Sequence, residues 1–147
     1  MEAIEKKLYQ CAEYEMRIKE LQKQVDEILS QHNSLLDALL KSPSLEDVKV
    51  QGGTVSDPVF AAVQKIIDVY GARIESIRAE IADLGYLIDS IMKMVNSAGL
   101  TETEREYIQY RYFEKLRVSQ TAARMGYSEK QVWRLKKNVI KKLEDVR

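Results

Sequence analysis

The stretch "GYSEKQVWRLKKN", Gly126 to Asn138, decides how the last third of the chain folds. Gly126 suits a sharp turn because glycine enters the left-handed backbone conformation without a steric penalty. Ser128 is a preferred helix N-cap because its hydroxyl accepts a hydrogen bond from a free amide of the first turn. Apolar residues then recur in steps of three and four, the spacing of one helix face, at Val132, Leu135, Val139 and Leu143. The stretch therefore predicts a turn followed by an amphipathic helix.

The opposite face of this helix is cationic and carries the only tryptophan of the chain. The residues that must point outward are Lys130, Trp133, Arg134, Lys137 and Lys141. A basic helix face alone is commonly just a solvated surface. A helix that a glycine turn presents N-terminus first, however, has the shape and charge to enter the major groove of DNA. Two roles stay open for Trp133, contact with a sugar or thymine methyl group and packing against a neighbouring domain.

The residues before the turn fit the first helix of a helix-turn-helix. Ala122 is small where two helices must approach closely, and Met125 and Tyr127 occupy positions that are predicted to be buried. Further upstream, Thr101 and Glu104 have the spacing of a capping box, which marks the start of another short helix. Residues 100–147 are therefore predicted to form a small domain of three short helices.

Residues 1–41 are predicted to form one long helix with a coiled-coil heptad. The heptad positions are Ile4, Cys11, Ile18, Val25, His32 and Leu39, followed at three residues by Tyr14, Leu21, Ile28 and Leu35. On this seam we expect Cys11 to act as a small buried hydrophobe and His32 as a core or register-setting polar group. Residues 42–57 contain two glycines, a proline and three serines, so we predict a linker there.

A second long helix is predicted over residues 58–97, because proline at position 58 suits a first helical turn. Its apolar stripe alternates steps of four and three and needs a partner helix along its length. We assign oligomerisation to part of this stripe, namely Ile67, Ile74, Ile77, Ile81, Leu84, Ile88 and Ile91. The predicted fold is therefore all-α, with a long antiparallel helical hairpin followed by a small C-terminal helix-turn-helix domain.

The hairpin alone is predicted to leave apolar surface exposed. Ile66, Leu87 and Met94 widen the stripe of the second helix on one side. A homo-oligomer, with a dimer favoured, would cover this flank. The alternative is a monomer in which the C-terminal domain covers it.

Composition limits the remaining classes of function. One cysteine and one histidine offer no cluster of soft metal ligands, and we expect neither a metal nor a cofactor. No glycine-rich phosphate loop or paired nucleophile and base is present, so we expect no enzyme and no small-molecule substrate. Charge interrupts every long apolar run, and we expect a cytoplasmic protein without a signal peptide or membrane span. Residues 100–147 hold 12 Lys/Arg against 7 Asp/Glu, a net charge of +5, whereas residues 1–99 are net acidic.

The segment "LTETEREYIQYRYFEKLRVSQTAARMGYSEKQVWRLKKNVIKKL", Leu100 to Leu143, resembles region four of bacterial sigma factors. The residues that carry this resemblance include the Leu-Thr pair, the Glu-Arg-Glu triplet, and Arg111, Tyr112, Ala122, Gly126, Ser128, Val132, Leu135 and Leu143. Thr121 departs from the pattern because sigma-like modules usually have Ile or Val there. The whole chain is more loosely similar to phage and prophage late-gene regulators of the ArpU and RinA type. Nothing in it resembles the sigma region that melts promoter DNA.

The resemblance implies a role for each outward residue of the recognition helix. Base edges would be read by Glu129, Lys130, Trp133 and Arg134. Phosphates would be held by Ser128, Gln131, Lys136, Lys137 and Lys141.

The predicted function is sequence-specific binding of double-stranded DNA by a phage or prophage transcriptional regulator in the bacterial cytoplasm, associated with the nucleoid. It would act as a dimer on late or packaging gene promoters. Two other interpretations stay open. The chain could be the small subunit of a phage packaging terminase, or an interaction protein whose sigma-like module binds RNA polymerase without touching DNA.

Overall fold

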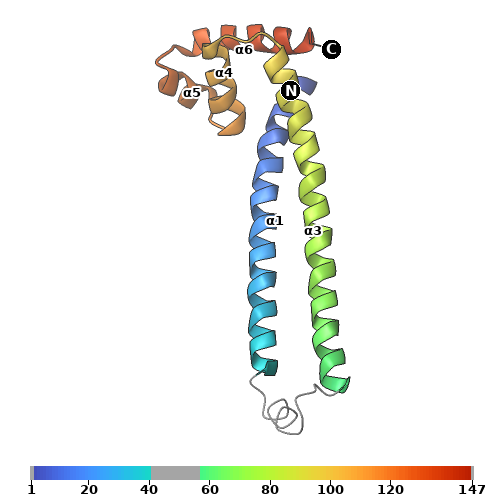
Figure 1. Cartoon of the computed structure of the whole chain (residues 1–147). Helices are drawn as coiled ribbons and strands as arrows, with labels where there is room; N and C mark the ends of the chain where they lie inside the picture. The colour runs from blue at the N-terminus through green and yellow to red at the C-terminus, as the bar shows by residue number, and fades with distance from the viewer. Residues whose placement is uncertain (1, 41–56, 147) are drawn as a thin grey trace. The chain divides into compact units, whose positions relative to one another are not determined.

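The computed structural model describes residues 2–40 and 57–146, and every regular element within them is helical (Figure 1). The elements are α1 (Ala3–Leu40), α3 (Asp57–Ser97), α4 (Glu102–Ile108), the π-helical η1 (Gln109–Phe113), α5 (Val118–Met125) and α6 (Glu129–Glu144). The all-α prediction is confirmed for these residues, and both long helices lie close to their predicted bounds. The predicted linker lies outside the described residues except for its last residue, which begins α3.

The chain divides into two compact units, and each long helix contributes to both. Unit 1 joins the chain up to Ile18 with the chain from Asp83 onward, and unit 2 is Lys19–Ala82. Unit 1 therefore extends well beyond the small domain that we predicted for residues 100–147. It includes the beginning of α1 and the end of α3.

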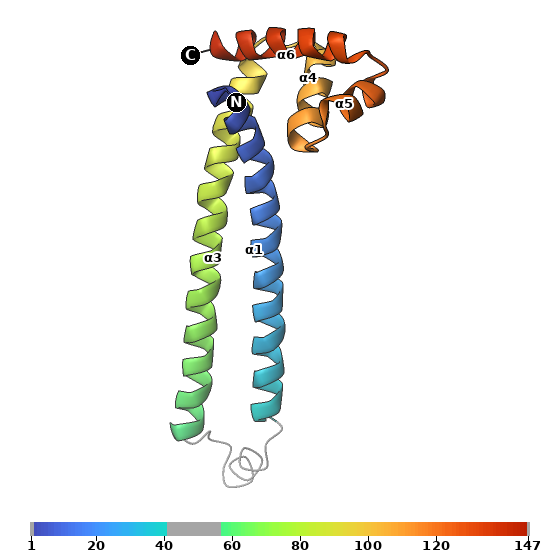
Figure 2. The same cartoon turned by 180° about the vertical axis from the view of Figure 1, so that it is seen from behind.

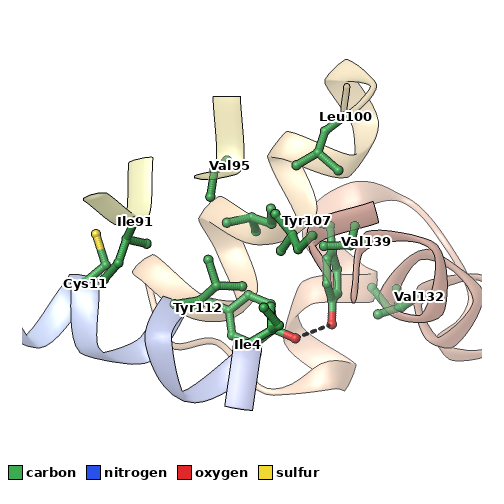
Figure 3. Close-up of a cluster of buried hydrophobic side chains, with 13 residues drawn as sticks. Ile4, Cys11, Ile91, Val95, Leu100, Tyr107, Tyr112, Val132 and Val139 are labelled. Carbon is green, nitrogen blue, oxygen red and sulfur yellow. Dashed lines mark hydrogen bonds between the residues drawn. The ribbon is translucent and has the colours of Figure 1, made fainter. Parts of the chain in front are cut away.

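The core of unit 1 is built from six helical elements, α1, α3, α4, η1, α5 and α6, and Figure 3 shows part of it. Its largest fully buried side chains are Tyr107 and Tyr112, which lie between the long helices and α6. The start of α1 lies beside the end of α3 in both views of the chain (Figures 1 and 2). The buried residues that these two segments and the C-terminal helices share are Ile4, Leu8, Cys11, Ile91, Val95, Leu100, Tyr107, Ile108, Tyr112, Ala122, Val132, Val139 and Leu143. The burial of Cys11 was predicted from the heptad.

In unit 2 the two helical segments run antiparallel, with the His32 and Tyr70 rings packed at 5.4 Å between centroids. The buried apolar residues of the described part of this unit are Leu21 and Ile74. Several large apolar side chains are exposed instead, among them Leu29, Leu35, Phe60, Ile67 and Val69. Unit 2 is thus a helix pair with a one-sided core.

The stripe to which oligomerisation was assigned follows this division. Ile74 and Ile91 are buried, and Ile67 is 42% exposed. The stripe residues between Ile74 and Ile91 are half-buried, namely Ile77, Ile81, Leu84 and Ile88. Much of the stripe is therefore covered within the chain, and its role between chains stays a prediction.

None of the described helices is both long and apolar enough to cross a membrane. Within residues 2–40 and 57–146, no group of three or more His, Cys, Asp or Glu side chains is arranged to hold a metal ion.

Candidate nucleic-acid interface

The turn between α5 and α6 has the conformation that its sequence predicts. Gly126 ends α5 with φ 71° and ψ 30°, in the left-handed region. The Tyr127 amide donates to the Ala122 carbonyl at 2.9 Å, and the Gly126 amide donates to the Ala123 carbonyl at 3.4 Å. These two bonds form a Schellman motif, which satisfies carbonyls that the helix end would otherwise leave free. The turn is therefore fixed by the backbone itself.

The start of α6 is fixed by a reciprocal cap. The Gln131 amide donates to Ser128 Oγ at 3.2 Å, and the Ser128 amide donates to Gln131 Oε1 at 2.8 Å. Ser128 was predicted as the N-cap, and glutamine at the third helical position completes the capping box. Both side chains were also assigned to phosphate contact, and the structure gives them this local role.

The inward face of α6 anchors it on the rest of unit 1. Val132, Val139 and Leu143 are fully buried and Leu135 is half-buried, as their spacing predicts. On α5, Ala122 is buried where the two helices meet, which was also predicted. Thr121 is fully buried at the position where the sequence departs from the sigma pattern. The apolar side of α6 is therefore packed against the rest of unit 1.

The prediction that Tyr127 is buried is wrong, because its side chain is 38% exposed. Tyr127 directly follows the left-handed Gly126, and its amide is committed to closing the turn. Its ring lies at a shallow hollow that Gln131 and Arg134 also line. The phenol thus belongs to the outer surface beside the start of α6.

All four residues that were assigned to base reading are exposed. Glu129, Lys130, Trp133 and Arg134 lie within the first two turns of α6. Neither Lys130 nor Arg134 forms an ion pair with any described residue. Their contacts with DNA stay a prediction, but no part of the described chain covers them.

The three lysines assigned to phosphates lie in different surroundings. Lys137 and Lys141 are exposed on the outer side of α6. Lys136 is half-buried, with its Nζ 3.4 Å from Glu5 Oε1 and 4.7 Å from the centre of the Trp133 ring. The carboxylate on α1 that meets Lys136 was not predicted.

Glu5 is the centre of a buried polar network. Its side chain accepts a hydrogen bond from Tyr112 Oη at 2.8 Å and from the Glu2 amide at 3.3 Å. Tyr107 Oη lies 3.3 Å from Tyr112 Oη. Burial opposes ionisation of Glu5, but the hydrogen bonds and the Lys136 charge outweigh it, and its pKa is lowered. Burial, the Tyr107 hydroxyl and the Glu5 charge raise the pKa of Tyr112, so Tyr112 stays a neutral donor.

A second buried carboxylate fixes the start of α4. Glu104 Oε1 accepts from Lys142 Nζ at 2.6 Å and from the Thr101 amide at 3.0 Å, which completes the predicted capping box. Burial opposes ionisation, but these bonds outweigh it and lower the pKa of Glu104. The pair ties the first helix of the module to the last turn of α6.

Sequence reasoning missed the whole contribution of α1 to this site. Leu8 and Ala12 are buried beside the heptad positions Ile4 and Cys11, and Glu5 is buried next to Ile4. That second apolar line was a signal that the first turns of α1 meet two partners. The Arg111 guanidinium likewise lies 5.7 Å from the centre of the Tyr9 ring and 5.8 Å from that of Tyr112.

Residues 98–145 match the family model described as Sigma-70, region 4. Comparison with curated proteins and with solved structures finds no significant match. The matched segment contains α4, η1, α5 and α6, and it is a sigma-region-four-like helix-turn-helix. Such a module is a DNA-binding regulatory element of transcription and not a catalytic one.

Proposed function

We propose that the chain is a sequence-specific double-stranded DNA-binding regulator of transcription, and that the start of α6 enters the major groove. The observation that carries the proposal is the division of α6 into two faces. One face is buried in unit 1, and the other presents Lys130, Arg134, Lys137 and Lys141 to solvent without an ion pair to any described residue. A helix face with four such cations has the shape and charge to enter the major groove.

Within this proposal, bases are read at the N-terminal end of α6. Arg134 and Lys130 donate to guanine O6 and N7, and each good contact contributes about 1–3 kcal/mol of discrimination. Glu129 accepts from a cytosine amine. Trp133, which is 48% exposed, packs on a sugar or a thymine methyl group.

Phosphates are held beside and beyond these residues. Lys137 and Lys141 lie one and two turns further along the exposed face. About three or four of the exposed cations of α6 neutralise phosphates, which corresponds to a slope of log affinity against log salt of roughly −3 to −4 per subunit.

We further propose that the regulator acts as a homodimer through unit 2, at late or packaging gene promoters of a phage or prophage. The exposed Phe60, Ile67 and Val69 support the dimer, because a second copy would cover them. Linking two recognition helices makes the second DNA contact intramolecular, which compensates for the modest affinity of each helix for DNA. The phage assignment rests on the looser resemblance of the whole chain.

The test is selection of bound fragments from the source genome at two salt concentrations. We expect one enriched site upstream of an operon, and retention that falls with salt. Arg134→Ala should lower affinity for that site by about 5- to 100-fold. The matched control is Arg78→Ala on α3, which removes the same charge from an exposed position of unit 2 and should leave affinity unchanged.

Two results would contradict the proposal. Absence of salt-sensitive binding to any double-stranded fragment would remove the DNA-binding function. Equal loss of affinity in Arg134→Ala and Arg78→Ala would show that only net charge matters, and that α6 does not read sequence.

A further inference from the structure

The first turn of α1 and the middle of α6 meet through one carboxylate. Glu5 is buried, with only 8% of its side chain exposed, and its Oε1 lies 3.4 Å from Lys136 Nζ. The same oxygen accepts the Tyr112 hydroxyl at 2.8 Å, and Oε2 accepts the Glu2 amide at 3.3 Å. A carboxylate held by a buried tyrosine and a backbone amide cannot change its position freely. It therefore offers Lys136 a fixed partner.

Lys136 in turn connects Glu5 with the exposed tryptophan. Its ammonium lies 4.7 Å from the centre of the Trp133 ring, within the range of a cation–π contact. Its side chain is 28% exposed, so water screens these two contacts only in part. Lys136 and Trp133 line one surface hollow together with Glu2, Ile140, Lys137 and Lys141.

We propose that Glu5 is a positioning residue for the recognition helix. It holds the Lys136 ammonium over the Trp133 indole, fixes that indole on the exposed face of α6, and keeps the Lys136 charge away from DNA phosphates. The effect on DNA phosphates rests on the proposed function, whereas the placement of Lys136 and of the indole concerns the folded chain alone. Lys136 is thereby assigned a role different from that of Lys137 and Lys141.

The geometry favours positioning over simple stabilisation. A lysine at a free surface position samples many rotamers, and an indole half-exposed beside it would do the same. Here a buried anion selects the Lys136 rotamer that also lies over the ring. An acid on the first turn of α1 thus determines the shape of a surface that is more than 120 residues away in sequence.

The experiment uses the full chain and the fluorescence of Trp133, which is the only tryptophan. Glu5→Gln keeps an oxygen that accepts the Tyr112 hydroxyl but removes the charge that holds Lys136. We expect acrylamide quenching of Trp133 to increase in Glu5→Gln and in Lys136→Gln, because the ammonium no longer covers one ring face. Lys136→Arg should restore quenching close to the original value, since a guanidinium both pairs with carboxylates and stacks on rings. Circular dichroism checks that each variant is folded.

The matched control is Glu13→Gln on the same helix. Glu13 also pairs with a lysine, Lys115, at 3.8 Å, but on an exposed surface away from Trp133. Its quenching should equal that of the unchanged chain. If Glu5→Gln folds and its quenching is also unchanged, the positioning role is overturned. If Glu5→Gln fails to fold, the comparison of Lys136→Gln with Lys136→Arg decides, and equal quenching in these two overturns it.

Titration with DNA at several salt concentrations tests whether Glu5 keeps the Lys136 charge away from phosphates. In Glu5→Gln the freed Lys136 can reach a phosphate, so the slope of log affinity against log salt should become steeper by about one unit. In Lys136→Gln the slope should stay at its original value. An unchanged slope in Glu5→Gln would show that Glu5 does not keep Lys136 away from phosphates. If the unchanged chain binds no DNA, the proposed function fails, and the quenching results still decide whether Glu5 positions Trp133.

Discussion

Units 1 and 2 use the same two long helices but bury them differently. The heptad seam of α1 and the apolar stripe of α3 continue through both units, yet among the described residues the buried apolar side chains of unit 2 are Leu21 and Ile74. In unit 1 the helices of the sigma-region-four-like module cover the pair and bury two tyrosines between them. The difference teaches that a heptad is sufficient to align two helices, whereas a complete core needs a third layer.

Polar groups differ between the units in the same way. Unit 1 buries the Glu5 and Glu104 carboxylates, and each has a lysine and further hydrogen bonds as partners. In unit 2 two polar contacts of the described residues are exposed, Gln64 with Asp68 at 3.0 Å and Arg78 with Glu75 at 3.7 Å. Exposed pairs of this kind contribute little to stability. Unit 1 should therefore respond strongly to changes in its core and in its ionisation.

The largest expected effect is that of Leu8→Ala in unit 1. Leu8 has 0% exposure, so truncation leaves a cavity in the shared core. We expect the free energy of unfolding of unit 1 to fall by about 2–5 kcal/mol. Urea unfolding followed through Trp133 fluorescence measures it, because the only tryptophan lies in this unit.

Leu35→Ala makes the same change on the same helix in unit 2 and serves as the matched control. Leu35 is exposed, so the transition detected by Trp133 should shift by about 0.5 kcal/mol or less. Equal shifts in the two variants would remove the distinction between the units. No shift in Leu8→Ala would show that α1 is not part of the core around the recognition helix.

A smaller effect is expected for Lys142→Met, which removes the partner of buried Glu104. We expect a loss of about 1–3 kcal/mol at pH 7, because a buried carboxylate is left without its cation. Lys142 keeps some solvent exposure, which places the loss toward the lower end. The pKa of Glu104 is lowered from 4.5, so its contribution is complete above that pH and disappears as the pH falls through the folded-state pKa.

Urea unfolding at pH 7 and at pH 3 measures this loss. The difference between Lys142→Met and the unchanged chain should shrink at pH 3. Arg78→Met breaks the exposed pair of unit 2 and should cost little at either pH. A loss in Lys142→Met that is the same at both pH values would mean that packing of the lysine stem, and not charge, holds the end of α6.

The local features of the helix-turn-helix were predictable because neighbouring residues determine them. The left-handed Gly126, the Ser128 cap and the buried Val132 line each follow from spacing within one or two turns. The contacts of Glu5 with Tyr112 and Lys136 join positions more than 100 residues apart, and no periodicity within one helix encodes them. The burial of Tyr127 was predicted wrongly because an aromatic residue beside a turn can point either into the core or toward solvent.

The smallest expected effects come from replacing a glycine by alanine, which should destabilise unit 1 and stabilise unit 2. Gly126→Ala in unit 1 places a Cβ at φ 71°, which should cost about 1–2 kcal/mol. Gly71→Ala in unit 2 lies within α3, where alanine should stabilise the helix by about 0.5–1 kcal/mol. A new Cβ meets no described atom within 4 Å at either position, so backbone conformation alone sets the sign.

Thermal unfolding followed by circular dichroism, together with Trp133 fluorescence, separates the two outcomes. Gly126→Ala should lower the midpoint temperature of the transition that Trp133 fluorescence reports. Gly71→Ala should raise the midpoint temperature at which unit 2 loses its helical circular dichroism signal. A destabilising Gly71→Ala would mean that a neighbouring surface approaches that face of α3 closely, as a second copy of the chain would. The sign of this small effect therefore tests whether the one-sided core of unit 2 is covered on the face that carries Gly71.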